Sequence, residues 1–101
     1  MNKYQRLQGE LETNGEGKMK GFGNSMMPII KSGSLLTFKT VDKYEIGDIV
    51  FCKVKGRWID AHKITKIDAK GRFMIANNHG FENGWTTQVF GKVVEIEEPK
   101  K

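Results

Sequence analysis

A chain of 101 residues can bury one modest hydrophobic core but not two, so we expect a single domain. Apolar residues make up 38% of the chain and charged residues 29%, a balance that excludes an intrinsically disordered protein. The formal net charge of +5 weakly favours anionic partners, but the basic residues are scattered among acidic ones, which more often marks a solvated surface.

Cysteine and histidine usage narrows the chemistry further. Cys52 is the only cysteine, so no internal disulfide can form, and a reducing compartment such as the cytoplasm is expected. The apolar run 49–52 favours a buried thiol over a reactive one. With one cysteine and two histidines at no close ligand spacing, we expect no metal site and no other cofactor. No stretch of about twenty apolar residues indicates a membrane span, and no signal-peptide core is visible.

In chain order, residues 1–17 are predicted to form a flexible N-terminal tail, in which residues 4–11 could make one or two helical turns. Residues 18–98 are predicted to form the folded domain, because short β-type runs there alternate with Gly, Asn and Asp; residues 99–101 form a basic end. The predicted strands cover residues 34–38, 49–54, 58–67, 72–76 and 88–96, with a long polar loop over residues 77–86. We therefore expect a mainly β fold with a small, coiled, barrel-like antiparallel sheet.

The first residue that could carry chemistry is Ser25, which follows a glycine-rich stretch and precedes the apolar pair Ile29-Ile30. A serine held at a turn can be exposed and backed by free backbone N–H groups, as a nucleophile with an oxyanion site requires. Gly, Asn, Ser and Pro are also common in ordinary turns, so this stretch alone leaves both interpretations open.

The second such residue is His62, in the predicted strand 58–67. Alternate side chains of a strand face opposite sides, so Trp58, Asp60, His62, Ile64 and Lys66 are expected on one face. The other face would carry Ile59, Ala61, Lys63, Thr65 and Ile67. His62 could therefore interact with Asp60, while its neighbour Lys63 would point away.

Five short motifs follow one another along the chain: Gly23-Asn24-Ser25-Met26-Met27-Pro28, Ser32-Gly33-Ser34, Gly47-Asp48-Ile49-Val50, His62-Lys63-Ile64 and Gly91-Lys92-Val93-Val94. Their order resembles the LexA-like and type I signal peptidase superfamily of serine peptidases, and the resemblance covers roughly residues 21–96. It implies a small β fold in which the serine of the first motif, Ser25, is the nucleophile. It also implies that the substrate binds as an added β-strand beside the active-site cleft.

Most members of this superfamily use a lysine as the general base. The matching pair here is His62-Lys63, which resembles the histidine variant of archaeal and endoplasmic-reticulum signal peptidases, so the resemblance implies that His62 is the base. The predicted strand phase agrees, because it directs Lys63 to the opposite face. An imidazole has an ordinary pKa of about 6.5, so a histidine can accept a serine proton at neutral pH without strong desolvation.

The nucleophile would also need an oxyanion site and a substrate pocket. The resemblance implies that the backbone N–H groups of Ser25 and Met26 hold the oxyanion. Met26 and Met27, followed by Pro28, would contact the substrate and could line an adaptable apolar pocket, although methionines near a turn more often fill the core.

Support for the base is the least defined part of the resemblance. Asn78 matches the asparagine of a signal-peptidase motif, but Asn77 occupies the position of its acidic residue. Asp60 could orient His62 instead. His79, on a predicted loop, is a competing base, although a surface histidine is the more ordinary interpretation.

No membrane anchor or DNA-binding domain is visible ahead of the matched region, so the chain resembles an isolated peptidase core, a form expected in mobile elements such as bacteriophages. We expect a soluble serine endopeptidase that performs acyl transfer on a protein or peptide with a Ser25/His62 dyad. The alternative is a catalytically inactive module of the same fold that binds a partner protein or peptide.

Two further kinds of partner are less well supported by the sequence. Nucleic-acid binding would require aromatic residues interleaved with a basic stripe, and no such stripe is evident. An exposed strand edge would permit a dimer, which the sequence does not specify.

Overall fold

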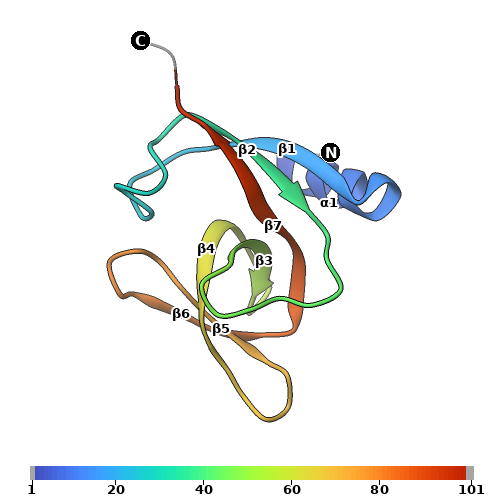
Figure 1. Cartoon of the computed structure of the whole chain (residues 1–101), viewed down its shortest axis with the longest axis vertical. Helices are drawn as coiled ribbons and strands as arrows, with labels where there is room; N and C mark the ends of the chain where they lie inside the picture. Colours follow the sequence, from blue (N-terminus) through green and yellow to red (C-terminus); the bar gives the residue numbers. More distant parts are fainter. Residues whose placement is uncertain (1, 100–101) are drawn as a thin grey trace.

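The computed structural model describes residues 2–99, which form one helix and seven strands (Figure 1). The elements are α1 (Lys3–Asn14), β1 (Glu16–Gly21), β2 (Ser34–Lys39), β3 (Ile49–Val54), β4 (Arg57–Ile67), β5 (Phe73–Ala76), β6 (Glu82–Thr86) and β7 (Gln88–Glu97). All pairings are antiparallel, in the order β1-β2-β7-β3-β4-β5-β6. The predicted mainly β fold with a coiled antiparallel sheet is therefore confirmed.

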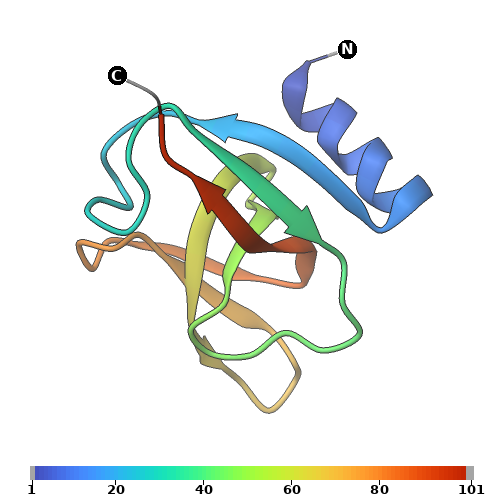
Figure 2. The same ribbon diagram turned by 45° about the horizontal axis from the view of Figure 1, so that its top comes forward.

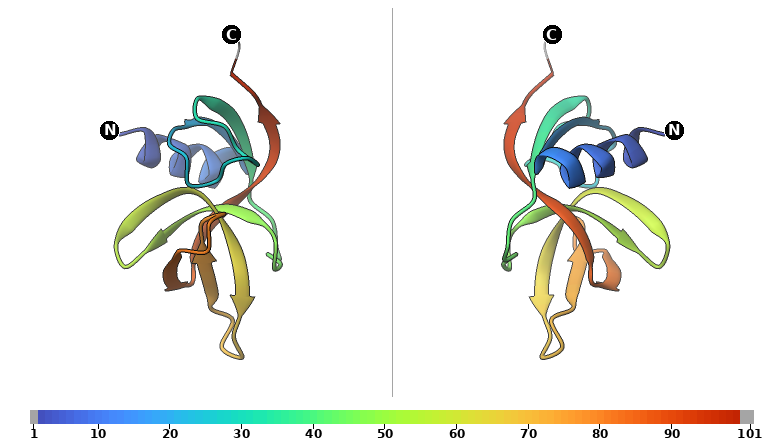
Figure 3. Two further views of the ribbon diagram at one scale, coloured as in Figure 1. Left: turned by 90° about the vertical axis from the view of Figure 1, so that its left-hand side faces the viewer. Right: turned by 90° about the vertical axis from the view of Figure 1, so that its right-hand side faces the viewer.

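Strand β7 joins the two halves of the sheet. Its end pairs with β2 and its beginning pairs with β3, and the register shifts within both pairings. Figure 3 shows β7 passing from the half that contains β1 and β2 to the half that contains β3 to β6. Register shifts of this kind bend a strand and increase its twist, which coils the sheet. The sheet stays open, because within residues 2–99 no pairing joins the edge strands β1 and β6.

The coiled sheet encloses two clusters of buried side chains. The first contains Leu7, Leu11, Met19, Met26, Ile30, Leu36, Phe38, Phe51 and Ala61. The second contains Val50, Cys52, Val54, Ile64 and Ile75. Cys52 is fully buried, as the apolar run around it predicts, and burial raises the pKa of its thiol to about 12.

The N-terminal segment differs from the flexible tail that the sequence predicts. Helix α1 begins with a capping box, in which the Asn2 side chain accepts a hydrogen bond from Gln5 N and the Gln5 side chain accepts one from Asn2 N. It ends at Gly15, whose φ of 73° is readily adopted by glycine. Leu7 and Leu11, one turn apart, are buried in the first cluster. The segment is therefore part of the fold.

A glycine lets α1 lie close to β1, and the two elements lie side by side in Figure 2. A Cβ atom added at Gly17 would lie 2.7 Å from Leu7 Cδ1. Two leucines in a twelve-residue polar stretch are a weak helical stripe, which explains why the sequence did not predict that the helix packs. At the other end, Lys100 and Lys101 of the predicted basic end lie outside the described residues.

The five predicted strands correspond to β2, β3, β4, β5 and β7, each within one residue at either end. Two strands were missed: β1, which runs from the end of the predicted tail into the predicted domain, and β6, within the predicted loop 77–86. In β1 two of the three buried positions are glycines, so the apolar alternation is weak. In β6 the sequence Glu-Asn-Gly-Trp-Thr has no apolar alternation at all.

The predicted two-face alternation of β4 is wrong over part of the strand. Trp58 and Ala61 pack against the first cluster, whereas Ile59 and Ile64 pack against the second. The reason is a shift of one residue in the pairing of β4 with β3, because an extra residue reverses the side-chain phase beyond it.

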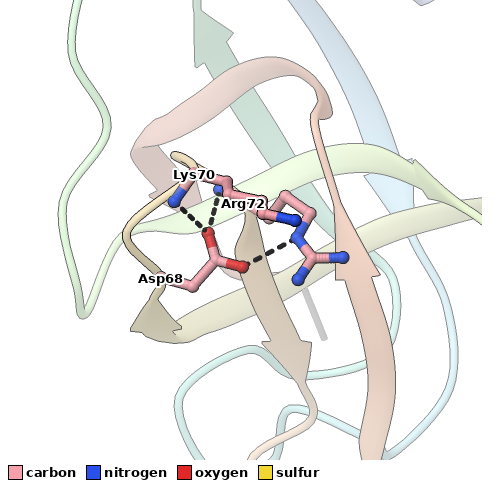
Figure 4. Close-up of polar contacts among 3 residues, drawn as sticks. All are labelled: Asp68, Lys70 and Arg72. Carbon is pink, nitrogen blue, oxygen red and sulfur yellow. Dashed lines mark hydrogen bonds and ion pairs between the residues drawn. The ribbon is translucent and has the colours of Figure 1, made fainter.

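The turn between β4 and β5 is held by one carboxylate (Figure 4). Asp68 Oδ1 accepts hydrogen bonds from Lys70 N at 3.0 Å and Arg72 N at 2.8 Å. Asp68 Oδ2 accepts a third from Arg72 Nε at 2.7 Å. These contacts, first among them the backbone N–H of Arg72, hold the pKa of Asp68 below its ordinary value. These contacts fix the C-terminal end of β4, and the same strand carries His62 near its middle.

Candidate active site

The segment between β1 and β2 brings Ser25 to the middle of β4. Ser25 Oγ lies 3.0 Å from His62 Nε2, within hydrogen-bond distance, although 37 residues separate them in the sequence. Both side chains are partly buried. The structure thus brings together the two side chains that the sequence predicts as nucleophile and base.

The other imidazole nitrogen contacts a residue that the sequence analysis did not single out. His62 Nδ1 lies 2.7 Å from Asn83 Oδ1, on β6. An amide oxygen can only accept a hydrogen bond, so Nδ1 carries the proton and donates it to Asn83. Nε2 is then an acceptor that faces the hydroxyl of Ser25. The contact with Asn83 therefore selects the tautomer that a general base requires.

A local irregularity of the sheet directs Asn83 toward the histidine. In the pairing of β5 with β6, Ala76 lies opposite Glu82 and Ile75 lies opposite Gly84, so Asn83 has no partner residue. Such a bulge re-aims the side chain of the extra residue. The sequence offered no signal for this role, since Asn followed by Gly ordinarily indicates a turn.

Asn78 contacts the serine turn rather than the histidine. Its backbone N donates to Ser25 O at 2.9 Å, and its side-chain Nδ2 donates to Met27 O at 2.9 Å. Its Oδ1 accepts a hydrogen bond from Lys63 Nζ at 3.3 Å. Asn78 therefore holds the turn that carries Ser25 and makes no hydrogen bond with His62 among the described contacts, in contrast to its predicted role as support for the base.

The second histidine also contacts this turn. His79 Nε2 lies 3.0 Å from the carbonyl oxygen of Asn24, to which it donates a hydrogen bond. The loop 77–81 and the loop 22–33 thus lie side by side, as Figures 1 and 2 show. In this arrangement His79 is a donor to the serine loop, and His62 is the histidine that faces Ser25 Oγ.

The backbone beside Ser25 has N–H groups that are not used within the turn. Met27 N donates to Asn24 O at 3.1 Å, which closes the turn. Within residues 2–99, the N–H groups of Ser25 and Met26 donate no hydrogen bond. Two adjacent free donors beside a serine hydroxyl are the elements of an oxyanion site.

Ser25 and His62 lie in a cleft of about 280 Å³. Its other lining residues are Tyr4, Gly21, Phe22, Gly23, Met26, Ile30, Leu36, Trp58, Ile59, Asp60 and Ala61. Of the three residues predicted to contact substrate, Met26 lines the cleft, whereas Met27 and Pro28 do not. Polar and apolar groups both line the cleft, and Asp60 supplies its carboxylate.

Asp60 contacts helix α1 rather than the imidazole. Its Oδ2 lies 3.7 Å from Lys3 Nζ. Burial, followed by a hydrogen bond to Asp60 and by the charge of Asp60, raises the pKa of Tyr4 to about 12. The predicted alternative of Asp60 as the orienter of His62 is not what the geometry favours, because Asn83 occupies that position.

Comparison with known proteins places the chain in a family. The model of the peptidase S24-like family matches residues 13–94, most of the chain, and the chain belongs to this family. The resemblance drawn from the five motifs is thereby confirmed at the level of the superfamily. No curated protein matches the chain. No helix within residues 2–99 is long and apolar enough to cross a bilayer.

Proposed function

We propose that the chain is a serine endopeptidase in which Ser25 is the nucleophile, His62 is the general base and Asn83 positions His62. The observation that carries the proposal is the hydrogen-bond chain from Ser25 Oγ through both imidazole nitrogens to Asn83 Oδ1, at 3.0 Å and 2.7 Å. Membership of a peptidase family makes this function plausible. A cytoplasmic location, expected from the cysteine usage, belongs to the same proposal.

In the first half of the reaction, Ser25 Oγ attacks the carbonyl carbon of a peptide bond and its proton moves to His62 Nε2. A C–O bond forms, and the carbonyl oxygen becomes an oxyanion that the N–H groups of Ser25 and Met26 can stabilise. The C–N bond then breaks, and His62 gives the proton to the leaving amine. An acyl-serine and a free amine result.

In the second half, water replaces the amine. Its oxygen attacks the acyl carbon while His62 Nε2 takes one of its protons. The ester bond to Ser25 then breaks, and the proton returns from His62 to Ser25 Oγ. The products are a carboxylic acid and the regenerated enzyme, and water is the only added reactant.

An open strand edge beside the cleft supports binding of the substrate as an added strand. Strand β5 pairs with β4 only from Lys63 to Ile67, so the edge of residues 57–62 facing away from β3 has no strand partner among the described residues. The edge strand β1 ends at Gly21, which also lines the cleft. An extended peptide could therefore form backbone hydrogen bonds there while its side chains enter the cleft.

The test is cleavage of a diverse peptide mixture, with products identified by mass spectrometry. We expect new termini with the native chain, and none above background with Ser25→Ala or His62→Ala. Thr87→Ala, which removes an exposed hydroxyl outside the cleft, is the matched control and should cleave like the native chain. Circular dichroism checks that all variants fold.

Two outcomes would contradict the proposal. Cleavage that survives both Ser25→Ala and His62→Ala would mean that another site or a contaminant is responsible. Binding of peptides by the native chain without any cleavage would support the alternative, an inactive module that binds a partner.

A further inference from the structure

A lysine of helix α1 occupies a cation-binding environment at one end of the cleft. Lys3 Nζ lies 3.7 Å from Asp60 Oδ2, 5.1 Å from the ring centroid of Tyr4 and 5.3 Å from that of Phe22. A carboxylate and two aromatic rings around one ammonium group are the features by which proteins bind organic cations. Asp60, Tyr4 and Phe22 all line the cleft that contains Ser25 and His62.

The exposure of these residues leaves them accessible to a ligand. Phe22 is 65% exposed, so its ring can be reached from the cleft that it lines. The Lys3 and Asp60 side chains are 36% and 26% exposed, so their ion pair contributes little to folding stability. A partly open site with a carboxylate and aromatic rings, next to the proposed catalytic dyad, is suited to a cationic ligand that enters from solvent.

We propose that Asp60 and Phe22 form a subsite of the cleft that binds a lysine or arginine side chain of the substrate, and that Lys3 occupies this subsite until substrate displaces it. Asp60 precedes His62 by two residues on β4, which is at most about 7 Å along a strand, and both residues line the cleft. The basic residue would therefore lie within three residues of the cleaved bond. An arginine would add stacking of its planar guanidinium on the Phe22 ring.

Because Lys3 occupies the subsite in the free protein, substitutions at Lys3 and at Asp60 should change ligand binding in opposite directions. Lys3 is an intramolecular competitor on the first turn of α1, where its long side chain can move into solvent. Removal of the ammonium group should leave Asp60 and Phe22 free for an external cation. Lys3→Ala should therefore strengthen the binding of basic ligands, whereas Asp60→Asn should weaken it.

A matched control for Lys3→Ala exists in the same chain. Lys92 Nζ lies 3.8 Å from Asp48 Oδ1, and the two side chains are 33% and 19% exposed. This pair closely resembles Lys3–Asp60 in length and exposure but lies outside the cleft. Lys92→Ala removes the same charge and should leave ligand binding unchanged.

The binding test does not depend on catalysis. In the full chain carrying Ser25→Ala, backbone amide signals are followed by NMR during titration with Nα-acetyl-arginine amide or with its neutral counterpart, Nα-acetyl-citrulline amide. We expect arginine to bind about fivefold more tightly than citrulline, with shifts at Phe22 and Asp60. When Lys3→Ala is combined with Ser25→Ala, the preference for arginine over citrulline should increase. When Asp60→Asn is combined with Ser25→Ala, the preference should disappear.

Because Asp60 also contacts α1, loss of binding in Asp60→Asn could reflect a displaced helix. Phe22→Ala is the second variant, since the exposed ring can be removed without opening the core. It should weaken arginine binding about threefold while the melting temperature stays unchanged. Equal binding of arginine and citrulline in the Lys3→Ala background would overturn the proposal.

The second test, on specificity, rests on the proposed peptidase function. Peptides that the native chain cleaves are resynthesised with arginine or citrulline at each position within three residues of the cleaved bond. At one position arginine should raise kcat/KM about fivefold, and Asp60→Asn should remove the difference. Ser25-dependent cleavage without any such preference would overturn the subsite, whereas arginine-selective binding without cleavage would support the subsite and contradict the peptidase.

Discussion

The contact between His62 Nδ1 and Asn83 Oδ1 determines which imidazole nitrogen faces Ser25 Oγ. A carboxylate in this position would also stabilise the imidazolium that forms when His62 takes the serine proton. A neutral amide offers less of that stabilisation, but its oxygen still holds the ring and fixes the tautomer. At the scale of single residues, Asn83 is therefore a positioning residue for the proposed base.

The first prediction concerns Asn83. Asn83→Ala should lower kcat/KM by about 10- to 100-fold with little change in KM, because the ring loses its orientation while the cleft is unchanged. Asn83→Asp should restore most of the activity, because a carboxylate also accepts the hydrogen bond from Nδ1–H. The measurement is steady-state cleavage of one peptide from the mixture.

A separate readout distinguishes positioning from a general structural role. Imidazole nitrogen NMR should report a proton fixed on Nδ1 in the native chain and in Asn83→Asp, and a mixture of tautomers in Asn83→Ala. Equal activity in all three proteins, or an unchanged tautomer in Asn83→Ala, would show that Asn83 does not position His62.

At the scale of elements, predictability follows local pattern. Strands β3 and β7 have enough apolar and β-branched residues to be predicted closely from the sequence. Strand β6 has a polar, glycine-containing sequence, and it forms because β5 offers it an edge for pairing. Strand β6, which supplies Asn83, was thus among the elements that local pattern did not predict.

The same contrast holds within the candidate site. Ser25 and His62 could be singled out because the motif order resembles a known superfamily. Asn83 reaches His62 through a bulge between two strands, which depends on tertiary pairing and leaves no local signal. Lys3 meets Asp60 only because α1 folds back along β1, an arrangement that the predicted flexible tail did not include.

The second prediction tests whether α1 is an integral element. Leu7→Ala should lower the free energy of unfolding by about 2–5 kcal/mol, because the side chain is 1% exposed and its removal leaves a cavity. Urea denaturation provides the measurement. Glu12→Ala, on the exposed face of the same helix, is the control and should change stability by less than about 0.5 kcal/mol. A Leu7→Ala protein as stable as this control would mean that α1 does not pack on the sheet in solution.

At the scale of the whole molecule, three acidic groups have a higher pKa in the folded protein than in the unfolded chain. Burial raises the pKa of Cys52 to about 12, and burial with contacts to Asp60 raises that of Tyr4 to about 12. Burial is also the main reason that the pKa of Tyr44 is raised. Each group favours the folded state below its unfolded pKa, and this contribution disappears as pH rises toward the folded pKa.

The third prediction is that the protein loses stability at alkaline pH. The free energy of unfolding should be nearly constant from about pH 7 to 8 and should fall progressively from about pH 9 to 12. Chemical denaturation at a series of pH values measures it. In Cys52→Ala the fall should be shallower, although the variant is less stable overall. An equally steep fall in Cys52→Ala would contradict a thiol whose ionisation is suppressed by burial.

The family match begins at residue 13, whereas α1 supplies Lys3 and Tyr4 to one end of the cleft from outside the matched region. The fold is therefore a feature that the chain shares with its family. The residues of α1 next to the proposed subsite lie ahead of the matched region.

The most direct test of the central claim is covalent labelling of the serine. A fluorophosphonate forms a bond to the Oγ of an activated serine and releases fluoride, and the adduct is located by mass spectrometry. We predict one adduct, on Ser25, that is absent in Ser25→Ala and forms at least about 100-fold more slowly in His62→Ala. No adduct on the folded native chain, or an adduct whose rate does not depend on His62, would contradict a serine nucleophile activated by histidine.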